Sequence, residues 1–475
     1  MEDTMVGRLE EIKTLDEVMN RRDAQFVAVY GRRRVGKTYL IRQYFCNRFC
    51  FYHTGTADEG MKDQLMNFRD SLREYGLKDC PSLVSWKQAF GELRRLIADA
   101  EEGRKVIFID EMPWLDTPRS KFVSALEYFW NSWASARDDI VLIVCGSAST
   151  WIIDKVINNH GGLHNRITDQ IHLQPFRLRE CEELAGSLGL AYSRKDLCML
   201  YMIFGGVPYY WTFLRKGESV AQNVDRLLFQ DGGKLRGEFD SVMKSLFKNG
   251  EVHRCIIETL AEVGIGMTRN DLLRKAKLSD GNVFCKALSA LEKCGFIRRY
   301  TAYGKTKKDS LYQLVDSFSL FHLRFIAGES NPDEHFWSST SLSPRQKAWA
   351  GIAFERVCLG HIRQLKTALG VSGVITHVGS WRHVADDENP IGAQIDLLID
   401  RADNVIDICE MKFVEGAFVL DKKDADLLIN RRNVFAAVTG TMKSLHLVMI
   451  TSGNLVENSH SGIVQSRVCL DDLFA

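Results

Sequence analysis

The sequence lacks any apolar run near the roughly 20 residues that a helix needs to cross a bilayer. Its first residues, Met1 to Thr4, lack the basic and apolar regions of a signal peptide. The 12 cysteines are scattered without paired spacings, which is typical of reduced thiols rather than a disulfide framework. We therefore expect a cytoplasmic protein with no membrane partner.

An excess of one charge is also missing. The chain has 62 Lys and Arg against 61 Asp and Glu, so its net charge is +1. The net charge therefore does not indicate a nucleic acid or a membrane as partner, although local basic patches are compatible with a near-zero net charge. With 475 residues the chain is too long for one core, and about two to four domains are expected.

A convincing zinc motif is absent. Cys46, Cys50 and His53 form the only tight cluster of cysteine and histidine in the sequence. The cluster has no evident fourth ligand, and its spacing is not that of a zinc site. We interpret these residues as core packing in preference to metal binding.

A complete G-x-x-x-x-G-K-[ST] phosphate-binding loop is the strongest feature present. It follows an apolar strand-like run at 26–30 and leads into a helical stretch at 39–45, which is the context the pattern requires. Its glycines let backbone N–H groups face anionic oxygens. The predicted nucleotide-binding residues are Gly31, Arg32, Arg33, Arg34, Val35, Gly36, Lys37, Thr38 and Tyr39.

The loop residues have separate expected roles. Lys37 reaches the β- and γ-phosphates of ATP, and the Thr38 hydroxyl holds Mg²⁺. The buried-type strand at 105–111 ends in Asp110 and Glu111. Beside a phosphate loop, Asp110 acts on the Mg²⁺ and Glu111 orients or deprotonates the attacking water. Hydrolysis is therefore favoured over nucleotide binding alone.

Apolar strands at 26–30, 106–109 and 140–145 alternate with helical stretches, which predicts a largely parallel sheet covered by helices. The aromatic stripe at 122–133 has helical spacing, and we interpret it as core in preference to a base-stacking platform. Ser147 follows the third strand, where it is either a γ-phosphate sensor or a solvated turn serine. Arg166 is either an arginine finger, in cis or from a neighbouring subunit, or a surface charge.

Four segments together resemble the archaeal-type ATPases of the AAA+/STAND group. They are Val6-Gly7-Arg8, the loop from Tyr30 to Thr38, Ile109-Asp-Glu-Met-Pro-Trp114 and Gly205-Gly-Val-Pro-Tyr209, and the match runs from about residue 4 to 215. The resemblance implies an AAA+-like fold, and it implies Arg8 and Pro208 as secondary nucleotide contacts.

Residues 250–315 resemble a winged helix-turn-helix. Helical patterns at 252–260, after Thr268 and at 282–294 precede two strands around the basic tip 304–308. The third helix of such a module can enter a DNA major groove. Lys286, Arg298, Arg299 and the tip lysines Lys305, Lys307 and Lys308 are candidate phosphate contacts. A protein-docking or structural role is the alternative.

The C-terminal third carries a candidate nuclease site. Strands at 395–400 and 405–413 form a hairpin in which Asp396 and Glu410 can converge on a divalent metal. Strand alternation puts Lys412 on the face of Glu410, where it can activate the attacking water. Glu355, in a helical segment, supplies a further carboxylate. Charged hairpins also arise without such a site.

This arrangement resembles the PD-(D/E)xK nuclease fold, and more narrowly a C-terminal domain of unknown function often fused to archaeal-type ATPases. The segment 312–316 and Gly351-x-x-Phe354-Glu355 match the start of that domain. Gln394-Ile395 stands where the fold usually has proline. The resemblance implies an intact metal site, because its four polar residues are all present.

The predicted fold class is α/β: a P-loop AAA+-like ATPase core (1–178), a helical lid (179–245), a winged helix-turn-helix (246–316) and a restriction-endonuclease-like domain (317–475). ATP and Mg²⁺ are the expected cofactors; ATP or ADP, DNA and further copies of the chain are the expected partners. The favoured function is ATP-controlled action on DNA by a metal-dependent nuclease. A STAND-type signalling or assembly switch with a non-cleaving C-terminal domain is the alternative.

Overall fold

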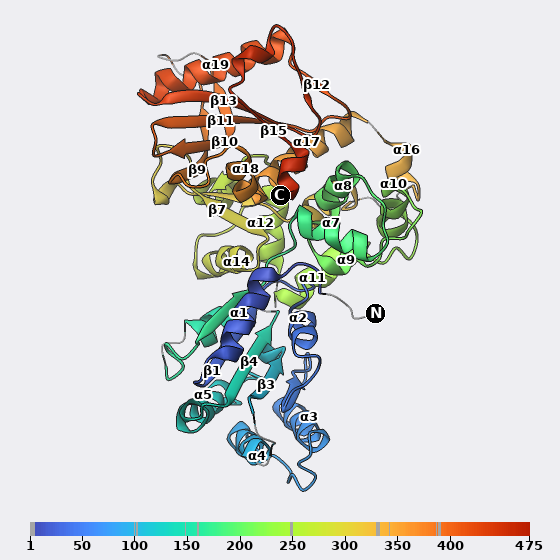
Figure 1. Cartoon of the computed structure of the whole chain (residues 1–475), viewed down its shortest axis with the longest axis vertical. Coiled ribbons are helices and arrows are strands. Elements are labelled where there is room, and N and C mark those ends of the chain that lie inside the picture. The colour runs from blue at the N-terminus through green and yellow to red at the C-terminus, as the bar shows by residue number, and fades with distance from the viewer. Residues whose placement is uncertain are drawn as a thin grey trace. The chain divides into compact units, whose positions relative to one another are not determined.

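The computed structural model of the chain describes residues 5–98, 100, 103–147, 149–158, 161–247, 250–328, 333–341, 343–385, 387 and 391–475. They divide into two compact units, Met1–Pro175 and Phe176–Ala475 (Figure 1). The four-part division expected from the sequence stays a prediction.

The first unit is built on a parallel five-stranded sheet in the order β2-β3-β4-β1-β5. The strands are β1 (Gln25–Tyr30), β2 (Phe51–Thr54), β3 (Lys105–Asp110), β4 (Ile140–Gly146) and β5 (Asp169–His172). The expected parallel α/β sheet is thus confirmed. Because the strands are parallel, the residues that follow β1, β3 and β4 meet at one edge.

Helices cover both faces of this sheet, as the buried strands require. Along β1, Val27 and Val29 share a core with α1 (Leu9–Asn20) and α2 (Lys37–Tyr44). The alternate residues Phe26 and Ala28 pack in a second core with α3 (Met61–Glu74), α4 (Trp86–Ala98), α5 (Phe122–Ser132) and α6 (Ser149–Ile152). The aromatic stripe of α5 lies in this core, so its interpretation as packing is confirmed.

The second unit begins with helices and then a small mixed segment. The helices are α7 (Leu178–Ser187), α8 (Arg194–Phe204), α9 (Pro208–Trp211), α10 (Val220–Val224) and α11 (Glu238–Leu246). The segment runs α12 (Glu251–Ala261), β6 (Met267–Thr268), α13 (Arg269–Ala276), α14 (Asn282–Lys293), β7 (Ile297–Tyr300) and β8 (Leu311–Leu314). Its strands form an antiparallel sheet in the order β6-β8-β7. The expected N-cap Thr268 accepts a hydrogen bond from the Asp271 amide.

The C-terminal part holds a second five-stranded sheet, in the order β15-β13-β11-β10-β9. Its strands are β9 (Thr376–His383), β10 (Ala393–Arg401), β11 (Val405–Lys412), β13 (Ser444–Thr451) and β15 (Ser466–Cys469). The first three are antiparallel, whereas β11, β13 and β15 are parallel. The register of β10 against β9 shifts between Ile395 and Leu398, which marks a bulge around Asp396.

Helices pack on this sheet as well. Along β11, Ile406 and Ile408 share a core with α19 (Lys422–Thr439), which lies along one side of the strands in Figure 1. The same strand contacts α17 (Pro344–Gly360), and α15 (Ser317–Phe325), α16 (Phe336–Ser339) and α18 (Ile362–Ala368) complete this part. The paired two-residue strands β12 (Phe418–Val419) and β14 (Leu455–Val456) lie apart from the main sheet.

Candidate functional site

The phosphate-binding loop lies between β1 and the N-terminus of α2. Gly31 has φ +152°, and a Cβ there would stand 2.3 Å from the carbonyl oxygen of Leu173. Gly36 has φ +93° and forms the N-cap of α2. Only glycine fits both demands, so the local backbone explains why the loop needs these two residues.

Lys37 lies at the centre of the loop. Its Nζ donates hydrogen bonds to the carbonyls of Gly31 (3.0 Å) and Arg32 (2.8 Å), and the residue is 6% exposed. The ammonium group is therefore fixed among the loop amides, where it can bind phosphate oxygens together with the N-terminus of α2.

Thr38 and Asp110 meet although 72 positions separate them. The Thr38 hydroxyl donates a hydrogen bond of 2.6 Å to Asp110 Oδ2, and the other carboxylate oxygen accepts the Glu111 amide at 2.8 Å. Asp110 ends β3 and is buried. A hydroxyl and a carboxylate in contact are oxygen ligands that suit Mg²⁺, so these residues fit the expected metal.

Glu111 and Ser147 follow the neighbouring strands β3 and β4. The Ser147 hydroxyl donates to Glu111 Oε2 at 2.8 Å, and its backbone N–H donates to the same oxygen at 3.3 Å. Glu111 has φ +43°, an uncommon conformation for a residue with a side chain. Ser147, the predicted γ-phosphate sensor, thus holds Glu111, the predicted base. The sequence analysis did not predict this hydrogen bond.

Two further buried residues lie near the loop and the carboxylates. Arg8 is 6% exposed, and its guanidinium donates to the carbonyls of Val35 (2.9 Å) and Gln174 (2.7 Å). It therefore braces the loop backbone. Cys145, at the end of β4, is fully buried, and burial together with the charge of Asp110 raises the pKa of its thiol well above the usual value. This cysteine stays protonated and packs beside the carboxylates.

The remaining predicted contacts lie farther along the chain or on the surface. Arg33 and Tyr39 are exposed, and Arg34 has φ +70°. Arg166 is exposed in a turn before β5, while Pro208 begins α9 in the second unit. Their roles toward the nucleotide stay predictions.

The residues of the predicted nuclease site come together in the second unit. Glu410 and Lys412 share one face of β11, as expected from alternation, with 3.0 Å between Lys412 Nζ and Glu410 Oε1. The other oxygen of Glu410 pairs with Arg431 of α19, which sequence reasoning missed. Asp396, in the bulge of β10, accepts a hydrogen bond of 2.8 Å from Gln394.

Glu355, on α17, is coupled to this group. Burial, followed by the nearby negative charge of Asp396, raises the pKa of its carboxyl to about 7. The neighbouring Arg356 lies 3.9 Å away and opposes this shift. The carboxylates predicted as metal ligands are thus close enough to influence one another.

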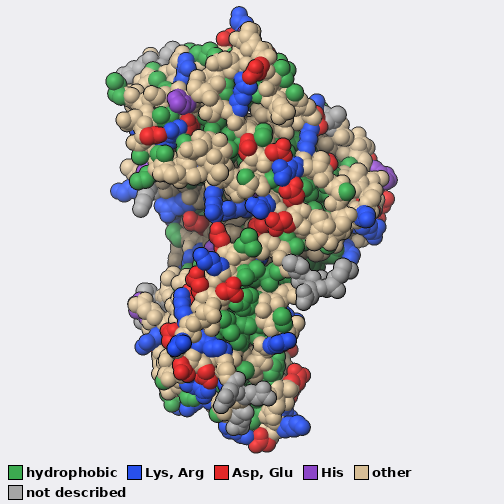
Figure 2. Space-filling view, in the orientation of Figure 1, with side chains coloured by type: hydrophobic (Ala, Val, Ile, Leu, Met, Phe, Trp, Pro, Cys, Tyr) green, Lys and Arg blue, Asp and Glu red, His purple; other side chains and the backbone are tan. Residues whose placement is uncertain are grey.

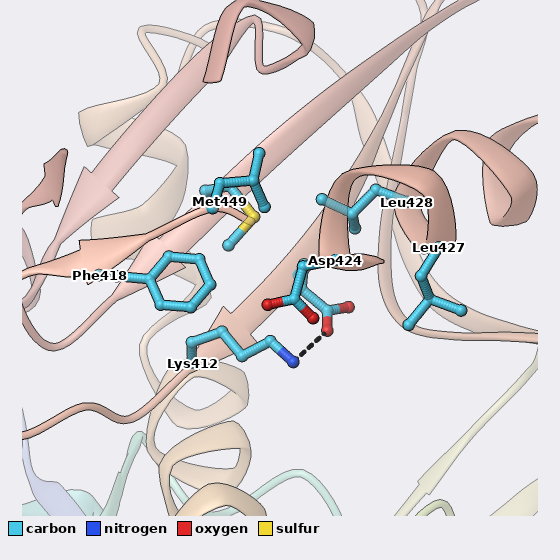
Figure 3. A pocket seen from close by; sticks show the side chains of 8 residues that line it. Lys412, Phe418, Asp424, Leu427, Leu428 and Met449 are labelled. Carbon is cyan, nitrogen blue, oxygen red and sulfur yellow. Dashed lines mark ion pairs between the residues drawn. The ribbon is translucent and has the colours of Figure 1, made fainter. Parts of the chain in front are cut away.

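A small pocket borders Glu410 and Lys412 (Figure 3). Its wall is formed by β11, α19 and nearby segments, and Lys412 and Asp424 point toward one another within it. Among the described residues, no group of three or more His, Cys, Asp or Glu side chains stands close enough to hold a metal ion. The predicted ligand set Glu355, Asp396 and Glu410 therefore gathers in one region without forming a ready-made metal cage, and it stays a prediction.

Cys46, Cys50 and His53, which we interpreted as core packing, differ in their surroundings. His53 is 3% exposed, its Nδ1 lies 2.9 Å from the Ser71 hydroxyl, and burial lowers its pKa to about 4. Core packing is right for His53 but not for Cys46, which is exposed.

The candidate DNA contacts of residues 246–316 differ in exposure. Lys286, Lys305 and Lys308 are exposed, whereas the Lys307 side chain lies outside the described part of the chain. Arg298 is half-buried: it donates to Gln313 at 2.7 Å and lies over the Tyr300 ring. Arg298 is thus engaged inside its own module, and the exposed lysines are the stronger candidates.

The described helices include none with the length and apolar character that crossing a lipid bilayer demands.

Known proteins resemble this chain over its first part and, in one case, over most of its length. Residues 5–213 match the family described as an ATPase domain predominantly from Archaea. The chain is 26% identical over 395 residues to Uncharacterized protein MJECL04 of Methanocaldococcus jannaschii, which covers 80% of this chain and 82% of that protein. It is 44% identical over 43 residues to Uncharacterized ATP-binding protein MJ0423 of the same organism, over 9% of this chain and 73% of that protein. The match to MJECL04 extends beyond residues 5–213, because it covers 395 residues.

Two solved structures are similar at low identity. The Walker-type ATPase PABY2304 of Pyrococcus abyssi is 18% identical, with 67% of this chain and 96% of that chain covered and a TM-score of 0.49. The ORC2 protein of Aeropyrum pernix is 13% identical, with 68% and 95% covered and a TM-score of 0.41.

Proposed function

We propose that residues 5–213, which match the family described as an ATPase domain predominantly from Archaea, bind ATP with Mg²⁺ and hydrolyse it. The observation that carries the proposal is the convergence of Thr38, Asp110, Glu111 and Ser147 beside the phosphate loop. Thr38 comes from the start of α2, Asp110 and Glu111 come from the end of β3, and Ser147 follows β4, so polar groups from three segments meet at one edge of the sheet.

The chain's own residues would divide the work. Lys37 and the loop amides bind the phosphates and orient the terminal one. Glu111 accepts the proton of the attacking water, and Ser147 holds that carboxylate in place. Bound Mg²⁺, near Thr38 and Asp110, would supply charge neutralisation at the phosphates. Arg166 and Pro208 would add contacts from other parts of the chain or from another copy of it.

We further propose that ATP controls action on DNA by the second unit. Residues 246–316 have the element order of a winged helix, and three lysines are exposed on α14 and the tip of the β7–β8 hairpin. Figure 2 shows basic and acidic side chains interspersed over the visible face of the chain. DNA would therefore bind through local groups such as these exposed lysines. The helix–sheet–helix order of α17, β9, β10, β11, α19 and β13 supports a restriction-endonuclease-like fold.

The nuclease part of the proposal depends on Asp396, Glu410 and Lys412. Two carboxylates and a lysine around one bulged hairpin can hold a divalent ion and activate water for attack on a phosphodiester. Purified protein should nick plasmid DNA in Mg²⁺ or Mn²⁺, with nucleotide changing the rate, and Asp396→Ala should abolish nicking without lowering ATP hydrolysis. Nicking that persists in Asp396→Ala would point to a contaminating nuclease.

A second candidate is a STAND-type switch whose C-terminal domain binds without cleaving. The pairing of Glu410 with both Lys412 and Arg431 favours it, because that carboxylate is already neutralised. DNA binding without nicking, across both metals and all nucleotide states, would select this reading.

A further inference from the structure

Glu410 is held between two cations that come from different elements. Lys412 lies two residues along β11, with 3.0 Å between its Nζ and Glu410 Oε1, while Arg431 pairs with Oε2 from the middle of α19. The three side chains are 34%, 21% and 14% exposed for lysine, arginine and glutamate. Two partly buried cations thus contact one carboxylate, in a pocket that Asp424 also borders.

The packing of α19 fixes the direction of Arg431. Leu428, three residues earlier, and Phe435, four residues later, are 3% and 0% exposed in the core of this sheet. Residues at these spacings share a helix face, so the face that carries Arg431 is turned to β11. Figure 3 shows Leu428 on α19 beside the pocket that Lys412 borders. Arg431 stands well inside the helix, so it caps neither end.

We propose that Arg431 is a phosphate-binding residue of this site, which together with Lys412 takes a phosphodiester group of DNA. The inference rests on the proposed function, since it supplies a substrate contact for the nuclease-type site. A guanidinium binds carboxylate and phosphate through the same two-pronged geometry, so the Glu410 carboxylate shows where an anion lies at Arg431. Lys412 approaches that anion from the other side, which makes a clamp of two donors.

The test compares Arg431→Ala with Arg432→Ala, a matched change at the next, half-buried residue of α19. Binding of a short fluorescein-labelled DNA duplex to the full chain is measured in Ca²⁺ over a series of salt concentrations. We expect Arg431→Ala to weaken binding by about tenfold and to lower the salt slope by about one. Arg432→Ala should leave the affinity within about twofold and the slope unchanged, since Arg432 pairs with none of the described residues. In Mn²⁺, Arg431→Ala should slow cleavage by about 100-fold.

The result that overturns the proposal is an Arg431→Ala protein with wild-type DNA affinity and salt slope, which makes the ion pair purely structural. If this variant does not fold, Arg431→Lys decides. It should keep the salt slope, because the charge remains, while cleavage falls at least about tenfold through loss of the fork; wild-type cleavage would contradict the proposal. Wild-type protein that never cleaves DNA, yet needs Arg431 to bind it, rejects the nuclease and keeps the phosphate site.

Discussion

The Ser147 hydroxyl donates a hydrogen bond to the Glu111 carboxylate across the ends of two adjacent strands, with 2.8 Å between Oγ and Oε2. Glu111 takes up a left-handed backbone conformation at this point, so its side chain leaves β3 in a direction that a regular strand would not give. The pair therefore holds a carboxylate in one place at the edge where phosphates are expected.

Ser147→Ala tests whether the hydrogen bond to Glu111 contributes to ATP hydrolysis. Without the hydroxyl, Glu111 loses a defined orientation, and we expect kcat for ATP to fall about tenfold while KM changes little. Steady-state phosphate release measures both constants. Ser132→Ala, at an exposed serine of α5, is the control and should match wild type. An unaltered kcat in Ser147→Ala would leave the bond without a catalytic role.

Gly31→Ala tests the loop backbone. A Cβ at this position meets the Leu173 carbonyl at 2.3 Å, in a backbone conformation with φ +152°, so we expect a loss of about 2 kcal/mol in the free energy of unfolding. Gly91→Ala is the matched control, because this glycine of α4 is exposed with nothing within 4 Å of an added Cβ. That change should stabilise by about 0.5–1 kcal/mol. Urea unfolding of both variants gives the comparison, and equal effects would contradict it.

Glu355 makes stability depend on pH. Burial, followed by the charge of Asp396, raises the pKa of its carboxyl from 4.5 to about 7. The unfolded chain releases this proton near pH 4.5, whereas the folded chain keeps it to about pH 7. Stability from this group is therefore present at low pH and lost as pH rises through that window, by at most about 3 kcal/mol. Calorimetry should show a smaller decline of Tm over this window in Glu355→Gln; an identical pH profile would show that Glu355 does not titrate there.

The tip of the β7–β8 hairpin is tested by replacing Lys305 and Lys308 with alanine. If these exposed lysines meet phosphates, affinity should fall alike for unrelated DNA sequences, and the salt slope should decrease by about two. Lys13→Ala combined with Lys78→Ala, at exposed sites in the first unit, controls for the charge change. An unchanged slope in the tip variant would make the segment a docking or structural module.

Local patterns in the sequence predicted much of the fold. The apolar runs at 26–30, 106–109 and 140–145 become buried strands, because such runs are what a sheet covered on both faces requires. Alternation along β11 placed Glu410 and Lys412 on one face, and the 3.0 Å ion pair confirms it. These features depend on the spacing of residues within a short segment, which can be read from the sequence alone.

Other features depend on contacts between distant segments. Ser147 and Glu111 are 36 positions apart, and their hydrogen bond follows from the pairing of β3 with β4 rather than from either strand alone. Arg431 reaches Glu410 only because α19 packs on β11. The bulge that holds Asp396 likewise arises from the register between strands. The hydrophobic periodicity within one segment does not predict such contacts between distant segments.

ATP turnover by the full chain in Mg²⁺ tests the central claim most directly, with wild type, Glu111→Gln and Lys37→Ala compared in one assay of nucleotide binding and phosphate release. The account predicts steady turnover by wild type. It predicts tight ATP binding with turnover reduced about 100-fold or more in Glu111→Gln, which keeps the phosphate contacts and loses the base. Lys37→Ala should not bind the nucleotide, because the loop loses its central ammonium. Equal turnover by wild type and Glu111→Gln would contradict the account.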